Sequence, residues 1–152
     1  MKGAPLAAAA LALLAGGCQY SYRVRAERHG DSYVLTARDG DGHFAPHACV
    51  RRIAVIEAGR TIWEIENPGN GWPHEARRCD STSFPIIYGR APAGFATVVA
   101  AVPLRADGDY VIVGEGVARY HGRFRLSAGL EVVNASGRDA RRPLDPRLVT
   151  SH

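Results

Sequence analysis

The sequence contains a single lysine, Lys2, beside eighteen arginines, and it has only three cysteines and one methionine in 152 residues. It has no internal repeat, and after the N-terminus no segment shows the 3.6-residue apolar period of an amphipathic helix. No apolar run reaches the roughly 20 residues that cross a bilayer as a helix. These absences exclude a repeat protein, a helical bundle and a chain with a membrane-spanning helix.

Short catalytic motifs are also missing. The chain has neither a Gly-x-Ser-x-Gly turn nor a Ser-x-x-Lys motif, which mark two large groups of serine enzymes. A cysteine nucleophile activated by histidine would need a free thiol, and we expect the candidate cysteines to be paired, as argued below. The sequence therefore predicts a protein that is not an enzyme and that carries no cofactor.

The N-terminus has the layout of a secretory signal. Lys2 forms a short basic region, an apolar stretch runs from about Leu6 to Ala15, and two glycines precede Cys18. The run 11–18 resembles the lipobox of bacterial lipoproteins, in which small residues precede a cysteine that receives diacylglycerol. Here Ala15 stands where that family usually has leucine, and Leu14 lies one position earlier.

This resemblance implies that residues 1–17 are a signal peptide and that Cys18 is lipidated with diacylglycerol and further acyl chains such as palmitate. Each buried CH₂ contributes about 0.8 kcal/mol, so several chains hold a protein on a membrane. Gln19 follows the cysteine, and in enterobacterial lipoproteins a residue other than aspartate at this position favours the outer membrane. The alternative is a secreted protein without an anchor.

Cys49 and Cys79 remain as an even pair once Cys18 carries the lipid. Disulfides persist in the oxidising compartment that an exported protein reaches. Joining the two cysteines closes a loop of about 30 residues, which stabilises the fold by roughly 3–4 kcal/mol in the chain-entropy model. The sequence therefore predicts a Cys49–Cys79 disulfide.

Removing the signal leaves 135 residues, enough for one domain with a hydrophobic core. Apolar and polar residues alternate with a period of two over most of residues 18–136, as in strands with one buried face. We expect strands near 20–27, 32–38, 49–57, 61–66, 84–88, 95–102, 110–113, 117–126 and 130–134. The hairpin of 49–57 and 61–66 has the clearest pattern, and Pro85 places the 84–88 strand at a sheet edge.

Many short strands separated by glycine- and proline-rich turns predict an all-β domain. We expect an antiparallel β-sandwich of about seven to nine strands, with a small barrel as the alternative. Trp63 follows Cys49 at the spacing of an immunoglobulin core tryptophan, but Cys79 comes too early for the inter-sheet bond. Residues 137–152 are charged, contain prolines and predict a flexible tail.

The middle of the chain resembles small uncharacterised proteobacterial lipoproteins over about 65 residues. The similarity is carried by Trp63-Glu64-Ile65, Pro85-Ile86-Ile87-Tyr88-Gly89, Pro92-Ala93-Gly94-Phe95, Leu104, Gly108-Asp109-Tyr110-Val111-Ile112 and Gly122-Arg123-Phe124. It implies a lipoprotein and supplies no activity.

Two features of the chain are candidate ligand sites. If Cys49 and Cys79 are joined, the pairs Arg51-Arg52 and Arg77-Arg78 approach each other, and guanidinium groups bind phosphate or carboxylate in bidentate fashion. Trp72, between Gly71 and Pro73 in the loop 67–82, is suited to stacking on a sugar or peptide. The alternatives are a solvated surface balanced by nearby acids for the arginines, and a packing role for the tryptophan.

A metal site is the weaker hypothesis. Histidine and cysteine are zinc ligands, and the chain supplies His43, His47, Cys49, His74 and Cys79. Their spacing fits no zinc motif, and an oxidised cysteine is not a ligand. Asp39 and Asp41 lack the further oxygens of a calcium loop. We therefore expect no metal.

Together these observations predict a membrane-anchored lipoprotein of the bacterial cell envelope, at the periplasmic face of the outer membrane. Its expected role is a non-catalytic interaction or envelope-maintenance module whose partners are the membrane and another envelope protein. The alternative is a lipoprotein that captures an anionic or sugar-like ligand through the 67–82 loop. The arginines are scattered among acids, so no nucleic-acid partner is expected.

Overall fold

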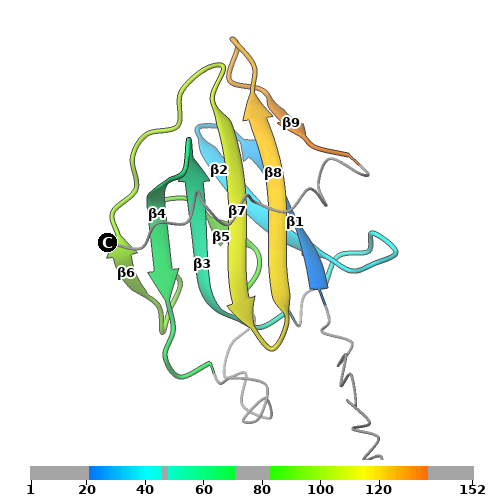
Figure 1. Ribbon diagram of the computed structural model, residues 1–152, viewed down its shortest axis with the longest axis vertical. Coiled ribbons are helices and arrows are strands. Elements are labelled where there is room, and N and C mark those ends of the chain that lie inside the picture. The colour runs from blue at the N-terminus through cyan, green and yellow to red at the C-terminus, as the bar shows by residue number, and fades with distance from the viewer. Residues whose placement is uncertain (1–20, 46–47, 71–82, 137–152) are drawn as a thin grey trace, which may run out of the picture.

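The computed structural model describes residues 21–45, 48–70 and 83–136, which contain nine strands and no helix (Figure 1). No helix in this part of the chain is long and apolar enough to cross a membrane. The predicted all-β class is confirmed. The strands are β1 (Ser21–His29), β2 (Ser32–Arg38), β3 (Val50–Glu57), β4 (Arg60–Glu66), β5 (Ile86–Ile87), β6 (Ala96–Val99), β7 (Asp109–Gly116), β8 (Arg119–Leu126) and β9 (Val132–Asn134).

All nine strands belong to one hydrogen-bonded sheet. Their order is β5-β2-β1-β8-β7-β3-β4-β6, and β9 pairs with β8 outside this path. Every pair is antiparallel except β1 and β8, which run parallel where Ser21–Arg23 meet Arg119–His121. The predicted sandwich of two separate sheets is not confirmed, because the hydrogen bonds continue from β5 to β6 without a break.

The sheet curls into a half-barrel, with β2 and β5 behind β3 and β7 in Figure 1. Its two ends approach each other at one point. The Tyr88 hydroxyl, just after β5, donates a 2.6 Å hydrogen bond to the carbonyl oxygen of Val102, just after β6. A Cβ on Gly89 would lie 3.4 Å from the Cβ of Ala101. The small barrel considered as an alternative is therefore closer to the structure than the sandwich.

The concave face of the half-barrel encloses the core. Trp63, Tyr110, Tyr120 and Phe124 are all fully buried. Tyr110 stacks on Phe124 with ring centroids 5.0 Å apart, and Tyr120 stacks on Phe84 at 5.7 Å. Aromatic side chains bury large apolar areas, so these rings supply much of the driving force for folding.

The β3–β4 hairpin matches its prediction closely. Ala58 and Gly59 form its two-residue turn, and both have positive φ, as a type I′ turn requires. Trp63 is fully buried, as expected for a core residue. Glu64, which the alternation places on the outer face of the strand, is only 6% exposed.

The expected strand at 95–102 is shorter in the structure. β6 covers only Ala96–Val99, and Val98 is 54% exposed. The pairing with β4 shifts register between Glu64 and Ile65 and leaves Val98 without a partner, as in a β-bulge. The apolar composition of this segment therefore does not correspond to a buried strand, because β6 is the last strand of the sheet.

Candidate functional site

An open groove of about 450 Å³ lies at the end of the sheet where β1 finishes and β2 begins. Its walls come from this hairpin, from the segment after β5, from the loop before β7 and from the β8–β9 turn. The groove lies where the curled sheet fails to close, beside the contact between Tyr88 and Val102. The mouths of barrel-like sheets are common ligand sites, and this volume falls within the usual range of about 300–1,000 Å³.

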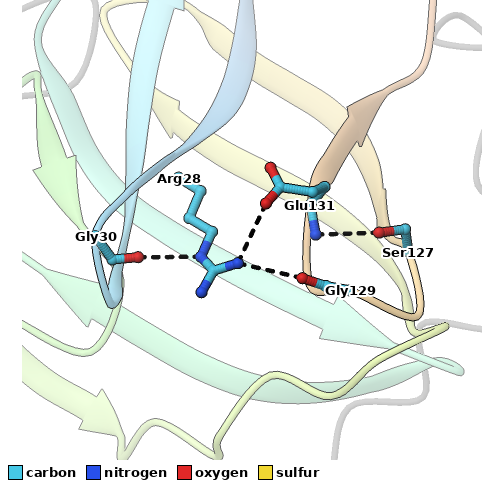
Figure 2. Close-up of polar contacts among 5 residues, drawn as sticks. All are labelled: Arg28, Gly30, Ser127, Gly129 and Glu131. Atoms are coloured by element: carbon cyan, nitrogen blue, oxygen red, sulfur yellow. Dashed lines mark hydrogen bonds and ion pairs between the residues drawn. The ribbon is translucent and has the colours of Figure 1, made fainter.

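Arg28 forms one wall of the groove and links two turns (Figure 2). Its Nε donates to the carbonyl oxygen of Gly30 at 3.0 Å, and one terminal nitrogen donates to that of Gly129 at 3.2 Å. The same nitrogen lies 3.4 Å from a carboxylate oxygen of Glu131. The backbone nitrogen of Glu131 donates to the Ser127 hydroxyl at 3.1 Å. These contacts hold the guanidinium in one position.

Tyr88 forms the opposite side of the groove and also reaches the core. Its ring meets Trp63 edge-on, with centroids 5.1 Å apart. Burial, and then the nearby Tyr110 and Glu57, raise the pKa of Tyr88 to about 12. The hydroxyl is therefore neutral at physiological pH and donates its proton to Val102.

The remaining charged groups of the groove are Arg90 and Asp31, and both are exposed. Arg90 forms no ion pair within the part of the chain that the structure describes. Arg28 shares its charge with Glu131, so two charges of the groove remain without an ion pair, one positive on Arg90 and one negative on Asp31. Leu104 and Leu130 add apolar surface. This lining suits a small organic anion with an apolar portion.

Arg51 and Arg52, proposed from the sequence as ligand-binding residues, both contact glutamates of β4. Arg52 forms a bidentate ion pair with Glu64, with N–O distances of 2.7 and 3.1 Å. This bond is the largest cause that raises the pKa of Arg52. Arg51 lies 3.5 Å from Glu66. Both arginines are thus balanced by acids of β4, whereas Glu75 and Asp80, the acids expected from the sequence to balance them, lie outside the described residues.

The other predicted site residues lie outside the described residues. These are Cys18, Trp72, Arg77, Arg78 and Cys79. Cys49, just before β3, is 2% exposed and disulfide-bonded. Because Cys79 is not described, its pairing with Cys49 stays a prediction.

Residues near both ends of the 67–82 loop form hydrogen bonds with the backbone of Val50, next to Cys49. The Ser83 hydroxyl accepts a 3.1 Å hydrogen bond from the Val50 nitrogen, and the Asn70 amide donates to the Val50 oxygen at 2.9 Å. Asn70 is 1% exposed, and its side-chain oxygen has no hydrogen-bond partner within the described residues. The two hydrogen bonds to Val50 therefore fix the start of β3 against Asn70 and Ser83.

Of the histidines and cysteines considered as metal ligands, the structure describes His43 and Cys49. No group of three or more potential ligands occurs among the described residues. His43 lies 3.8 Å from the Asp39 carboxylate, which also accepts the backbone N–H groups of Asp41 and His43. Asp39 therefore acts within its own turn. His47, His74 and Cys79 lie outside the described residues.

Sequence reasoning missed the groove residues Arg28, Tyr88 and Arg90. They come from three separate segments, and no spacing links them. Only the turn near residue 30 and the expected edge strand at 84–88 indicated that these segments end at a sheet margin. Comparison of the chain with protein-family models, with curated proteins and with solved structures found no match.

Proposed function

We propose that this protein is a non-catalytic binding module, held by a lipid on Cys18 at the periplasmic face of the outer membrane. The observation that carries the proposal is the position of the groove relative to the N-terminus. β1 begins at Ser21, three residues after Cys18, and Arg28 at its other end lines the groove. At roughly 3.3 Å per residue, Arg28 lies about 23 Å along the strand from Ser21.

This arrangement directs the groove away from the membrane. The proposed anchor precedes β1 by three residues in the sequence, whereas the groove opens at the end of the sheet opposite to the start of β1. The alternative ligand site, the 67–82 loop, follows β4, which ends at Glu66 opposite Arg52 near the start of β3. The described residues 67–70 therefore begin at the end of the sheet where β1 starts. The groove is thus the better placed of the two for a ligand in the periplasm.

The proposed ligand is a small organic anion with an apolar portion, presented by another envelope component or free in the periplasm. Arg90 supplies a guanidinium that forms no ion pair among the described residues, and the guanidinium of Arg28 supplies directional donors. Tyr33, Tyr88 and Leu104 contact the apolar portion. Guanidinium groups recognise carboxylates and phosphates through paired hydrogen bonds.

Metabolic labelling tests the anchor. Cells that express the full chain are grown with labelled palmitate, and the envelope is separated from the soluble fraction. The wild-type protein should carry label and sediment with the outer membrane, whereas Cys18→Ala should be unlabelled. A labelled Cys18→Ala protein, or an unlabelled wild type, would contradict a lipid on this cysteine.

Fluorescence titration with anilinonaphthalene sulfonate, an aromatic anion, tests the groove. We expect Arg90→Gln to raise the Kd about five- to tenfold, because one charge-assisted hydrogen bond is lost. Arg119→Gln is the matched control, since Arg119 is also exposed and lies at the other end of the sheet. The neutral probe phenylnaphthylamine should bind both variants equally. Equal affinity of both variants for the anion would exclude the groove as its site.

A further inference from the structure

The outer face of β1 and β8 carries three arginines that form no ion pair among the described residues. Arg23 and Arg25 lie on β1, and Arg123 lies on β8, the parallel neighbour of β1 in the sheet (Figure 1). Alternate residues of a strand share a face, and Val24 and Gly122, which lie between them in the chain, are buried on the inner face. Arg25 and Arg123 are exposed, and Arg23 is half-buried.

The acidic residues of the same outer face have other partners. Glu27 lies 3.4 Å from Arg38, and Asp109 lies 3.4 Å from Arg125. Glu115 is opposite Arg119 where β7 pairs with β8. Four-fifths of the chain separates the arginines of β1 from that of β8 in the sequence, so only the fold gathers these unpaired positive charges on one face.

Phe44 extends this face at the end of the sheet where β1 begins. Arg23 is opposite Arg38 in the β1–β2 pair, and Arg38 is opposite Phe44 in an isolated bridge. The guanidinium carbon of Arg38 lies 6.0 Å from the centroid of the Phe44 ring. Phe44 is 42% exposed. An exposed apolar side chain therefore stands in the same row of the sheet as Arg23.

We propose that this basic face, formed by Arg23, Arg25, Phe44 and Arg123, rests on the surface of a bilayer that contains anionic phospholipid. Sites for small molecules are concave, whereas this face is on the outside of the curled sheet, so an extended surface with many phosphates fits it better. Guanidinium groups bind phosphate through paired hydrogen bonds. An aromatic ring beside them suits the boundary between headgroups and acyl chains.

The position of the basic face agrees with the position of the groove. The face begins at the start of β1, and the groove opens at the other end of the sheet. Contact of the face with a bilayer therefore leaves the groove accessible to solvent. The proposal does not depend on a lipid on Cys18, so the two can be tested separately.

Co-sedimentation with phospholipid vesicles tests the basic face. The full chain carries Cys18→Ala, so no lipid contributes to binding, and the apolar stretch at the N-terminus is the same in every variant. The vesicles contain phosphatidylcholine alone or a mixture of phosphatidylcholine and phosphatidylglycerol. We expect the Kd for the mixed vesicles to be at least about tenfold lower than for the neutral vesicles, and to rise with salt concentration.

The double variant Arg25→Gln/Arg123→Gln should raise the Kd for the mixed vesicles about tenfold or more, because each arginine near an anionic surface contributes about fivefold. The double variant Arg105→Gln/Arg125→Gln is the matched control. It removes the same charge at two exposed arginines that form ion pairs near the other end of the sheet. Its Kd should change by less than about twofold, because surface charges that are distant from the bilayer are screened.

Phe44→Ser should raise the Kd about threefold, and this loss should persist at high salt, because it comes from apolar burial. Far-ultraviolet circular dichroism verifies that each variant is folded. Equal affinity for neutral and mixed vesicles would overturn the proposal, and so would equal losses in the two double variants, since net charge would then explain the binding. Binding to duplex DNA as tight as to the mixed vesicles, and lost in Arg25→Gln/Arg123→Gln, would also overturn it and would assign the face to nucleic acid.

Discussion

At the scale of single residues, Gly122 sets the distance between the first and the last long strands. A Cβ at this position would overlap the carbonyl oxygen of Val24 and would lie 3.0 Å from its carbonyl carbon. Both atoms belong to the backbone of β1, so neither can rotate away. Glycine is required here because β1 passes directly over β8.

Replacing Gly122 with alanine should therefore destabilise the fold. We expect the free energy of unfolding to fall by about 1–3 kcal/mol, as for overpacked sites, and urea denaturation would measure it. Gly129→Ala is the control, because the nearest atom to its new Cβ is 3.9 Å away. Equal denaturation midpoints for the two variants would contradict the close contact of β1 and β8.

The buried tyrosines make stability depend on alkaline pH. Burial raises the pKa of Tyr88 to about 12 and also raises the pKa values of Tyr110 and Tyr120 above the ordinary value of 10.0. In the unfolded chain these phenols ionise near pH 10, so the unfolded state loses protons first. Their contribution to stability is complete below pH 10 and is lost as the pH rises through the folded-state values.

We therefore expect the free energy of unfolding to decrease from pH 10 towards pH 12, measured by urea denaturation at each pH. Tyr88→Phe should reduce this decrease, because one phenol with a raised pKa is removed. The tyrosinate absorbance of the folded protein should rise in more than one step. A single step near pH 10 for all tyrosines would refute this prediction.

At the scale of elements, β9 fills the gap between β1 and β8 that the curling of the sheet opens. β1 pairs with β8 only at Ser21–Arg23, and β9 pairs with the other end of β8 at Phe124–Leu126. The Asn134 side chain spans the space between. Its oxygen accepts from the Ala26 nitrogen at 2.9 Å, and its nitrogen donates to the Ala26 oxygen at 2.8 Å. A side-chain amide thus replaces a strand as the partner of β1.

Asn134→Ala should leave both backbone groups of Ala26 without these bonds. We expect a loss of about 1–3 kcal/mol in the free energy of unfolding, since each partly buried bond contributes about 1 kcal/mol. Hydrogen exchange of the Ala26 amide should accelerate by a larger factor than exchange in β3. Asn134→Asp should lose the bond to the Ala26 oxygen, because a carboxylate cannot donate. Unchanged exchange at Ala26 in both variants would argue against the bridge.

The elements that the sequence predicted best are those with local partners. Period-two alternation predicted β2 and both strands of the β3–β4 hairpin. The turn between β3 and β4 followed from Ala58 and Gly59. The edge position of β5 followed from Pro85. The single curled sheet did not follow, because it depends on contacts such as Ala26 with Asn134, which are 108 residues apart. No local pattern specifies such a pairing.

At the scale of the whole molecule, Cys49 precedes Val50, the residue to which Asn70 and Ser83 hydrogen-bond. Ser83 is bonded to Val50, and Cys79 lies four residues before Ser83. Four residues span at most about 14 Å, so Cys79 is close enough in the chain to reach the sulfur of Cys49, next to Val50. The Cys49–Cys79 disulfide remains our proposal for the bond that Cys49 makes.

Reduction should then lower the stability of the domain by roughly 3–4 kcal/mol, as expected for a closed loop of about 30 residues. Urea denaturation of the mature protein with and without dithiothreitol measures the difference. Cys79→Ser should match the reduced protein and should be insensitive to dithiothreitol. Two reactive thiols in the denatured, unreduced protein would exclude the pairing and would restore the metal hypothesis.

The groove could not be located from the sequence for a related reason. It is bounded by Arg28, Tyr88 and Leu104, which belong to three segments that meet only because the sheet bends. The arginine pairs at 51–52 and 77–78 were prominent in the sequence because they are adjacent. Arg51 and Arg52 instead form ion pairs with Glu66 and Glu64. Adjacent arginines in the sequence therefore do not show that their charges are available to bind a ligand.

The parallel contact between β1 and β8 also governs the order in which this domain can assemble. A chain synthesised from its N-terminus delivers the β1–β2 hairpin well before β8 leaves the ribosome. One edge of β1 stays unpaired until β8 has been made, because β8, its neighbour in the sheet, lies near the end of the chain. Folding therefore finishes at the end of the sheet where β1 begins, and this end is the last to become protected against mispairing.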